Sequence, residues 1–431
     1  MRRLYRVLIR LAAPLAAAVV LIRGLRDPAY RRGIGERFGF GPPAAPGGIW
    51  LHAVSLGEVN AAVVMVRELR RRHPRLPILV TSATPTGRAK AQSAFAGMAQ
   101  VRYLPYDTPG AVARFLGRVD PLIAIVMETE LWPSLFEECA RRGLPIVLAN
   151  ARLSNRSLAR YLRFGALFRG LFSAGVTIAA QTREDADRFA RLGATPAQLH
   201  VVGNLKFDLQ AGTESADRAG VLRSEFAGRP TWVAGSTHAG EDEAVLRAHR
   251  ELRSTLPAAL LILAPRHPQR FDAVAALLER EGVSYVRRRA AAPVPADASV
   301  LLLDTTGELA LFYQAADAAF VGGSLVPVGG HNLLEPAAVG LPVLTGPSNE
   351  NAREVLALLR TAGAVRIVAD AGELAVSLGQ LFADPSLRAR LGAAGRELVA
   401  AQRGSVYRLL ALIEPLMEAA AARRAPALGN D

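Results

Sequence analysis

Short apolar segments alternate with segments of helical period along most of the chain, and this alternation limits the possible folds more than any other feature. In the first half, five segments have the length and composition of buried strands: 49–54, 78–81, 122–127, 146–149 and 176–180. Helical stretches follow at 58–72, 86–95, 133–142 and 157–172. Strands and helices in this order predict a parallel, doubly wound α/β sheet.

The second half repeats the same alternation, and its 431 residues make the chain long enough for two or three domains. Its predicted strands are 232–235, 259–264, 284–286, 300–303, 318–321 and 343–344, and its predicted helices are 241–252 and 271–281. Residues 210–230, rich in glycine, serine and charge, separate the halves. We therefore predict two Rossmann-like domains that face a cleft. The boundaries are an N-terminal segment 1–47, a first domain 48–209, a linker 210–230, a second domain 231–403, and a final helix and tail 404–431.

The N-terminal segment is strongly basic and partly apolar. Residues 1–40 contain nine arginines against Asp27 and Glu36, which accounts for half of the net charge of +14. An uncharged apolar run of twelve residues, 11–22, lies between Arg10 and Arg23, whereas a membrane-spanning helix needs about 20 residues. Starting at Leu4 lengthens the apolar segment but requires the arginines within it to snorkel. The pattern predicts an anchor on an anionic membrane surface.

Two alternatives for this segment are a cleaved signal peptide and a nucleic-acid-binding region. Three alanines at 16–18 resemble a cleavage site, but the single cysteine, Cys139, gives no sign of an exported protein, and the basic character continues to Arg37. No basic motif interleaved with aromatic residues supports binding to nucleic acid. We interpret Cys139, which follows Phe136 and two glutamates on a predicted helix, as a packing residue and not a nucleophile.

Residues 322–336, with the sequence GGSLVPVGGHNLLEP, connect a predicted strand to a short helix predicted at 337–340. Glycines let the backbone adopt positive φ and approach a ligand, and the first amides of a helix attract anions. The segment therefore predicts a phosphate site, with Glu335 able to accept hydrogen bonds from sugar hydroxyls. A turn that only reverses the chain is the alternative, but His331 and Asn332 add polar chemistry beside the glycines.

In the first half, the segment HAVSLGE at 52–58 leads from a predicted strand into a helix. Glu58 would open that helix, where a carboxylate is favourable simply as a partner of the helix dipole. The functional alternative is a general base that takes a proton from an attacking hydroxyl. His52 and Ser55 would line the same loop, although His52 is equally consistent with a buried, hydrogen-bonded histidine.

Two further segments of the first half place charge after a strand. Glu128 and Glu130 would point to the same side if the chain were extended, so we expect one of them to bind a ligand or assist catalysis and the other to cap the next helix. Lys206 follows the strand-like residues 200–202 and is one of only two lysines, with Lys90. A lysine there can neutralise a leaving phosphate or a substrate carboxylate, and an ordinary solvated lysine is the alternative.

In the second half, polar segments again follow predicted strands. Arg266 is suited to bidentate phosphate binding, and His267 to stacking on a base or binding a phosphate. The segments 236–238 and 304–308 are similar loops. The seven histidines show no metal-binding spacing, and phosphate-loop, nucleophile-elbow and dinucleotide-binding motifs are absent from the sequence. A dinucleotide-dependent oxidoreductase is therefore poorly supported.

Taken together, these motifs resemble the 3-deoxy-D-manno-octulosonic acid (Kdo) transferases of lipopolysaccharide synthesis, from about residue 30 to 403. The resemblance rests on long motifs: HAVSLGE at 52–58, METELWP at 127–133, NARLS at 150–154, GNLKFD at 203–208, STH at 236–238, PRHP at 265–268, DTTGEL at 304–309 and the segment 322–336. It implies a GT-B glycosyltransferase fold with an N-terminal membrane anchor at the cytoplasmic face of the inner membrane. It also implies CMP-Kdo as donor, bound by the second half, a lipid A precursor (lipid IVA) as acceptor, bound by the first half, and no metal, cofactor or nucleic acid.

The resemblance also implies roles for individual residues. Glu58 would be the proton acceptor, and Glu128 and Lys206 would stabilise the transition state. The implied CMP contacts are Arg266, His267, Thr306, Gly307, Glu308, Asn332, Leu333, Leu334 and Glu335. The chain departs from the family pattern at Val328, Leu333 and Asn155, which bears on substrate preference. The rival functions are a GT-B enzyme or epimerase that uses a UDP-sugar, and a non-enzymatic, membrane-bound nucleotide-binding protein.

Overall fold

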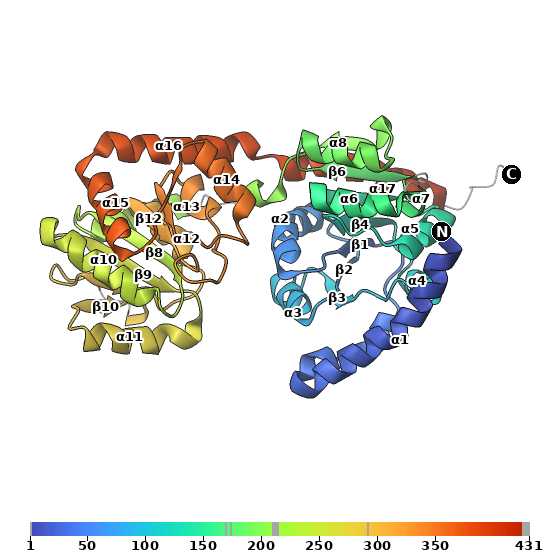
Figure 1. The fold of residues 1–431 in the computed structure, drawn as a ribbon, viewed down its shortest axis with the longest axis horizontal. Helices are drawn as coiled ribbons and strands as arrows, with labels where there is room; N and C mark the ends of the chain where they lie inside the picture. The colour runs from blue at the N-terminus through green and yellow to red at the C-terminus, as the bar shows by residue number, and fades with distance from the viewer. Residues whose placement is uncertain (1, 169, 173–174, 209–214, 291–292, 425–431) are drawn as a thin grey trace. The chain divides into compact units, whose positions relative to one another are not determined.

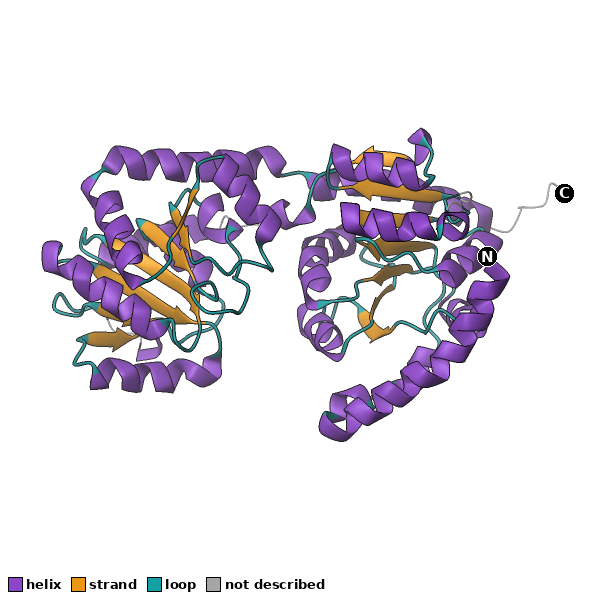
Figure 2. Ribbon diagram, viewed as in Figure 1, coloured by secondary structure: helices purple, strands orange, loops and turns teal. Residues whose placement is uncertain are grey.

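The computed structural model describes residues 2–168, 170–172, 175–208, 215–290 and 293–424, and it divides the chain into two compact units (Figures 1 and 2). Unit 1 comprises Met1–Asp208 together with Arg403–Asp431, and unit 2 comprises Leu209–Gln402. Each unit is built around its own seven-stranded parallel sheet with helices on both faces.

The sheet of unit 1 has the strand order β3-β2-β1-β4-β5-β6-β7. The strands are β1 (Ile49–His52), β2 (Ile78–Ser82), β3 (Gln100–Tyr103), β4 (Ile123–Met127), β5 (Ile146–Ala151), β6 (Val176–Ala180) and β7 (Leu199–Val201). Alternate residues of the central strand point to opposite faces: Leu51 belongs to one apolar cluster and Trp50 to the other. Because both faces are buried, the inner strands are continuously apolar, which made them recognisable in the sequence.

Helices cover both faces of this sheet. They are α1 (Arg2–Arg26), α2 (Leu56–Arg72), α3 (Pro85–Ala94), α4 (Pro109–Val119), α5 (Pro133–Arg141), α6 (Asn155–Arg163), α7 (Gly165–Phe168), α8 (Arg183–Leu192) and α17 (Ser405–Arg424), with 3-10 turns η1 (Pro28–Tyr30), η2 (Ile34–Phe38), η3 (Pro196–Gln198) and η4 (Leu205–Asp208). Leu409 and Ile413 of α17 lie in the same apolar cluster as Val66 of α2. The final helix therefore completes the core of unit 1.

Unit 2 has the strand order β10-β11-β9-β8-β12-β13-β14. Its strands are β8 (Thr231–Thr237), β9 (Leu260–Pro265), β10 (Tyr285–Arg287), β11 (Val300–Leu302), β12 (Ala318–Val321), β13 (Val343–Thr345) and β14 (Val365–Ile367). Its helices are α9 (Ser215–Glu225), α10 (Asp242–Thr255), α11 (Phe271–Arg280), α12 (Leu309–Ala315), α13 (Leu334–Ala338), α14 (Arg353–Thr361), α15 (Ala371–Ala383) and α16 (Pro385–Gln402), with turns η5 (Pro268–Arg270) and η6 (Arg288–Ala290). Two apolar clusters, one on each face, form its core.

Two details of the predicted organisation are wrong. The predicted linker 210–230 contains helix α9, and Ala219 and Leu222 of α9, with Phe226 directly after it, are buried in the core of unit 2; residues 210–214 of the predicted linker lie outside the described residues. The helical stretch predicted at 157–172 is broken after Arg163 into α6 and α7. The predicted final helix is present as α17 and belongs to unit 1.

Helix α1 contains the basic, apolar N-terminal segment. Residues Leu4–Leu25 are long and apolar enough to cross a membrane, judged by length and composition alone. Many large apolar side chains of this helix are exposed, with Leu15 at 70% and Leu25 at 73% of their full accessible surface. The sequence left open whether this segment spans the membrane or lies on it.

Candidate functional site

Glu58 sits in the first turn of α2, immediately after the carboxyl end of the central strand β1. Ser55 is the N-cap residue, and its Oγ accepts a hydrogen bond from the Glu58 backbone N–H at 3.4 Å. The Glu58 carboxylate accepts hydrogen bonds from the Val54 N–H at 2.8 Å and from the Ser55 hydroxyl at 2.9 Å. Glu58 and the N-cap Ser55 therefore stabilise the start of α2 together, and the structural interpretation of Glu58 as a carboxylate in the first turn of a helix is confirmed.

The same position gives Glu58 the electrostatics of a proton acceptor. Its side chain is buried, and burial raises the pKa of the carboxyl to about 7, with a further contribution from the negative charges of Glu128 and Glu130 and opposition from its hydrogen bonds with Val54 and Ser55. A carboxyl with a pKa near neutrality is suited to general base catalysis at physiological pH. The capping role and a catalytic role are therefore compatible in one side chain.

Glu128 follows β4, the strand next to β1, in the left-handed conformation with φ of +54°. A positive φ is strained for a residue with a Cβ atom, and such strain is concentrated at functional sites. The chain is therefore not extended at Glu128, so the condition under which Glu128 and Glu130 would point to the same side is not met. Glu128 is close enough to Glu58 for its charge to raise the pKa of Glu58.

The helix that follows, α5, is capped by a residue that the sequence did not suggest. Asp107, in the loop before α4, accepts hydrogen bonds from the Ser134 N–H at 2.9 Å and the Leu135 N–H at 2.8 Å. The prediction that Glu128 or Glu130 caps this helix is therefore wrong. Burial raises the pKa of the Asp107 carboxyl to about 6, although these hydrogen bonds oppose the increase.

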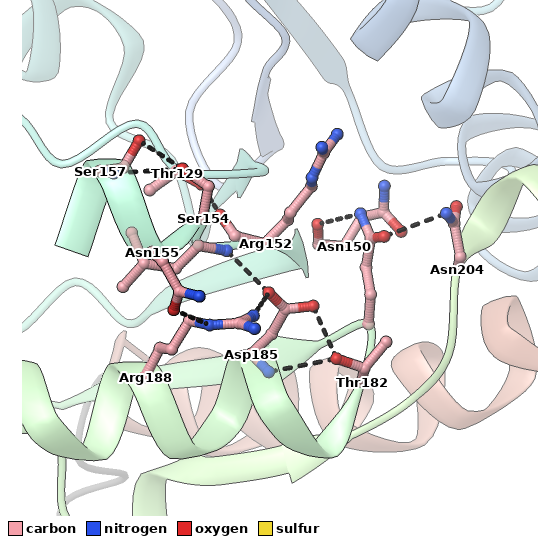
Figure 3. A network of polar contacts seen from close by, with 12 residues as sticks. Thr129, Asn150, Arg152, Ser154, Asn155, Ser157, Thr182, Asp185, Arg188 and Asn204 are labelled. Atoms are coloured by element: carbon pink, nitrogen blue, oxygen red, sulfur yellow. Dashed lines mark hydrogen bonds and ion pairs between the residues drawn. The ribbon is translucent and has the colours of Figure 1, made fainter. Parts of the chain in front are cut away.

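A chain of amide side chains fixes the turn that carries Lys206, across the carboxyl ends of β5, β6 and β7. Asn150 accepts a hydrogen bond from the Leu205 N–H through Oδ1 at 3.1 Å. Gln181 donates to the Asn150 carbonyl and accepts from Asn204 Nδ2, both at 3.0 Å (Figure 3). The Asn204 side chain in turn accepts from the Lys206 N–H at 3.0 Å.

Asn150 is the centre of this arrangement. It is fully buried, it has φ of +54°, and its Nδ2 lacks a hydrogen-bond partner among the described residues. The turn η4 packs against α2, so Lys206 is brought to the same end of the sheet as Glu58 and Glu128. The sequence indicated Lys206 but gave no reason to select Asn150, whose role depends on residues distant along the chain.

The loop after β5 is held by a second network, drawn in Figure 3. Asp185, in the first turn of α8, accepts hydrogen bonds from the Leu153 N–H at 2.9 Å and from Thr182 Oγ1 at 2.9 Å. Arg188 pairs with Asp185 at 3.1 Å and donates to Asn155 Oδ1 at 3.0 Å. Asn155 thus accepts a hydrogen bond from this arginine through its amide oxygen.

His52 and Cys139 have structural environments. His52 is fully buried, and its Nδ1 is 2.9 Å from Thr81 Oγ1 and 3.1 Å from the Thr81 carbonyl oxygen. Burial lowers the pKa of His52 to about 4, so the ring is neutral at physiological pH. Cys139 is buried in an apolar cluster, which raises the pKa of its thiol. The interpretations of a buried histidine and a packing cysteine are confirmed.

In unit 2, three histidines gather at the carboxyl ends of adjacent strands. His238 follows β8, His267 follows β9, and His331 lies in the loop after β12. The Nε2 atoms of His238 and His331 are 2.8 Å apart and their rings are stacked, while His267 contacts the edge of His238. Burial lowers the pKa of His331 to about 4, and the positive charge of Arg266 acts in the same direction.

The glycine-rich loop 322–333 differs from its prediction. The buried carboxylate of Glu241 accepts hydrogen bonds from the backbone N–H groups of Gly323 at 2.6 Å, Ser324 at 2.9 Å and Leu325 at 2.9 Å. A fourth bond comes from the His238 N–H at 3.0 Å. The amides of residues 323–325 thus already bind an anion that belongs to the protein, so the phosphate prediction is wrong for these three amides and stays a prediction for the rest of the segment 322–336.

The other residues predicted to contact a ligand in unit 2 lie at the same edge of the sheet. Arg266 and Glu335 are exposed, and Glu335 accepts a hydrogen bond from Asn332 Nδ2 at 3.0 Å. Leu333 and Leu334 are buried, so only their backbone can reach a ligand. Next to β11, the exposed pair Thr306 and Gly307 precedes Glu308, which is held by Arg288 at 3.1 Å.

The structure thus brings the predicted residues together in two groups, each described within its own unit. Glu58, Glu128 and Lys206 share one end of the unit 1 sheet. Arg266 and His267 join the histidine cluster of unit 2 beside Glu335, whereas Glu308 lies beyond β9. Within the described part of the chain, no group of three or more His, Cys, Asp or Glu side chains is arranged to hold a metal ion.

Comparisons with known proteins match both units. The family model described as 3-deoxy-D-manno-octulosonic-acid transferase (kdotransferase) matches residues 32–209, and the model for glycosyl transferases group 1 matches residues 283–398. A 3-deoxy-D-manno-octulosonic acid transferase from Haemophilus influenzae is 40% identical over 97% of this chain and 99% of its own length. One from Bordetella pertussis is 40% identical over 86% of this chain and 88% of its own length.

Solved structures show similarity of fold alone. A putative UDP-N-acetylglucosamine 2-epimerase from Listeria monocytogenes has a TM-score of 0.55 and 14% identity, covering 87% of this chain and 97% of the epimerase. MurG from Acinetobacter baumannii has a TM-score of 0.53 and 14% identity, covering 86% of this chain and all of MurG. The predicted GT-B type of fold, with two parallel-sheet α/β domains, is confirmed.

Proposed function

The chain belongs to the 3-deoxy-D-manno-octulosonic acid transferases, and we propose that it moves Kdo from CMP-Kdo to a hydroxyl group of the lipid A precursor lipid IVA. It is a glycosyltransferase of lipopolysaccharide synthesis, which confirms the activity implied by its motifs. The observation that carries the proposed mechanism is Glu58, a buried carboxyl with a pKa of about 7 at the carboxyl end of the central strand of unit 1.

In the proposed reaction, the Glu58 carboxylate takes the proton of an acceptor hydroxyl. The acceptor oxygen forms a bond to the anomeric carbon of Kdo while the bond from that carbon to the phosphate oxygen of CMP breaks, and the electron pair leaves with CMP. Attack opposite the leaving group inverts the configuration. One carboxylate suffices, because the phosphate of CMP leaves without needing a proton from a second acid.

Glu128 and Lys206, at the same end of the unit 1 sheet as Glu58, support this step. The charge of Glu128 raises the proton affinity of Glu58, which strengthens Glu58 as a base once it is ionised. Lys206, on the turn fixed by Asn150 and Asn204, supplies a positive charge for the negative charge that develops in the transition state. No metal ion or cofactor enters the proposed reaction.

The loop amides are already hydrogen-bonded to Glu241. We therefore propose that side chains, and not these amides, bind the phosphate of the donor. Arg266, His267, His238 and His331 form a cationic and hydrogen-bonding surface for the phosphate of CMP-Kdo. The exposed segment at Thr306 and Gly307 and the backbone at 332–335 would complete the contacts with CMP, including its ribose at Glu335. We further propose that the protein works at the cytoplasmic face of the inner membrane, where a basic N-terminal segment is close to an acidic, phosphorylated lipid.

Mass spectrometry of the product tests this proposal. Purified full-length protein with CMP-Kdo and the lipid A precursor should give a product heavier by one or more Kdo residues, and CMP should inhibit more strongly than UDP. The rival use of a UDP-sugar predicts the opposite order of inhibition. The absence of any Kdo-containing product, with folded protein and intact substrates, would exclude the proposed transfer.

A second test concerns Asn150, which we propose as a positioning residue for Lys206. We expect Asn150→Gly to lower kcat about tenfold with little change in the KM for CMP-Kdo, because the left-handed backbone is kept but the bond to the Leu205 N–H is lost. Asn150→Asp keeps an acceptor for that bond and should restore most of kcat. Equal losses in both variants would instead show that Asn150 Nδ2 donates to a ligand, and would contradict a purely positioning role.

A further inference from the structure

Helix α1 is tied to unit 1 at its first turn. The Tyr5 hydroxyl donates a hydrogen bond of 2.7 Å to Oδ2 of the buried Asp107, the same carboxylate that caps α5. Arg6 forms an ion pair with Glu137 of α5, and the Tyr5 side chain packs against the apolar cluster beneath. The start of the helix is therefore part of the folded unit.

The other end of α1 is tied to the same unit. Arg31 Nε donates to the Gly24 carbonyl at 2.5 Å, and the turns that follow are fixed on the sheet by Glu36. The Glu36 carboxylate accepts hydrogen bonds from the Tyr103 N–H of β3 at 2.8 Å and from Arg88 of α3 at 3.0 Å. Arg37 donates to the Ala83 carbonyl at 3.1 Å.

These two attachments decide whether the helix can span a membrane or must lie along its surface. A helix of 25 residues is about 37 Å long, roughly the thickness of a bilayer. If α1 crossed the bilayer, Tyr5 and Arg31 would lie on opposite sides of the membrane, and unit 1 could hold only one of them. With its start bound to unit 1 and the turns after its end fixed on the sheet, the helix lies along the surface of unit 1, as Figure 1 shows for the dark blue helix at the edge of unit 1.

The two sides of α1 differ in the way an in-plane helix requires. The side toward the protein carries the buried Ala13 and Gly24 and the half-buried Ile9 and Val20. The opposite side exposes a stripe of large apolar residues, namely Leu4, Val7, Leu8, Leu11, Leu15, Val19, Ile22 and Leu25. At about 100° per residue these positions span about a third of the helix circumference, which is wider than the seam of a two-helix coiled coil.

We propose that α1 lies in the plane of an anionic membrane surface, with its leucine-rich stripe inserted among the lipids and unit 1 held against the membrane. The helix carries arginines and no acidic residue between positions 2 and 26, and the exposed Arg10 and Arg23 flank its apolar middle. Basic residues beside an apolar face are the pattern that binds anionic bilayers in this orientation. The inference rests on the contacts of α1 and does not depend on the transfer reaction.

Thiol labelling of the full-length protein distinguishes the two orientations, since Cys139 is buried and contributes little background. The two test cysteines lie before and after the apolar stripe, at Arg3→Cys and Arg32→Cys. Labelling of right-side-out and inverted vesicles with a membrane-impermeant maleimide should show that both cysteines are accessible from the same face of the membrane. Reaction of Arg3→Cys only from the face opposite to Arg32→Cys would overturn the proposal.

Flotation with vesicles identifies what covers the stripe. Replacing Leu11, Leu15 and Ile22 together by glutamine should weaken binding to phosphatidylglycerol vesicles about tenfold or more. The matched control replaces three exposed apolar residues of unit 2, Val221, Leu358 and Val376, and should bind as the parent does. If the α1 variant binds vesicles normally but converts an oligomer into a monomer, a second copy of the chain covers the stripe and the proposal is wrong.

Discussion

Replacing Glu58 by glutamine should lower turnover by about 10² to 10⁴-fold, the range expected when a general base is removed. The parent enzyme should gain activity as the pH rises through about 7, where Glu58 loses its proton, and reach a plateau above it. The variant should lose this dependence. Initial rates of Kdo transfer at saturating substrate, measured from pH 5.5 to about 9, test both expectations, and near-normal turnover of folded Glu58→Gln would contradict the assignment.

Stability separates this loss from unfolding. The pKa of Glu58 is raised in the folded state, so its protonated form is favoured there, and the stabilisation present at low pH is lost as the pH rises through about 7. At pH 8 the ionised carboxylate costs at most about 3 kcal/mol. Glutamine removes that cost, and we expect the variant to melt at no lower temperature than the parent at pH 8.

Ser55→Ala is the matched control, because it weakens the cap and leaves the carboxylate in place. It should destabilise the protein by about 1 kcal/mol while keeping most of the turnover. Since the hydrogen bond from Ser55 lowers the pKa of Glu58, the inflection of the pH profile should move to higher pH. A loss as large as that of Glu58→Gln would mean that Glu58 acts through helix capping alone.

Replacing Glu241 by glutamine should have the largest structural effect in unit 2. Four backbone N–H groups converge on this fully buried carboxylate. The amide nitrogen of glutamine cannot accept hydrogen bonds, so at least one of these donors would be left buried and unpaired, at about 1–3 kcal/mol each. Hydrogen exchange at Gly323, Ser324 and Leu325 should accelerate, and thermal unfolding of unit 2 should begin at a lower temperature.

Glu243→Gln provides the comparison for Glu241. Glu243 also lies in the first turn of α10, but its side chain is exposed, so the change should alter stability by less than about 0.5 kcal/mol. If Glu241→Gln is equally mild, the loop does not depend on its internal anion. In that event, the amides at 323–325 would again be available to a phosphate.

The sequence predicted the central strands of both sheets because those strands are apolar on both faces. It missed β3 and β14, which lie at the sheet edges, where residues such as Gln100 and Ile367 are exposed and the apolar run is interrupted. Helix α9 lies in the segment predicted as a linker, because its glycine, serine and charged residues outnumber its buried ones. Only Ala219, Leu222 and Phe226, at helical spacing, indicated the buried side.

The sequence predicted those residues of the candidate site that directly follow a strand. Parallel strands collect the residues after their carboxyl ends at one edge, which placed Glu58, Glu128 and Lys206 in one unit and Arg266 in the other. The partners of these residues could not be predicted, because Asp107, Glu241 and Asn150 act on backbone groups far away in the sequence. The left-handed backbone at Glu128 is likewise set by the surrounding structure.

The last helix of the chain, α17, completes the core of unit 1, so the order of synthesis affects how this unit folds. Asp208 accepts hydrogen bonds from the Gly404 N–H at 2.6 Å and the Val406 N–H at 2.5 Å, and α17 fills the core of unit 1 beside α2. The ribosome must therefore translate all of unit 2 before unit 1 can close its core. Unit 1 therefore remains an incompletely folded intermediate while unit 2 is synthesised and folds. Nascent chains stalled before residue 405 should expose apolar surface on the face that α17 covers.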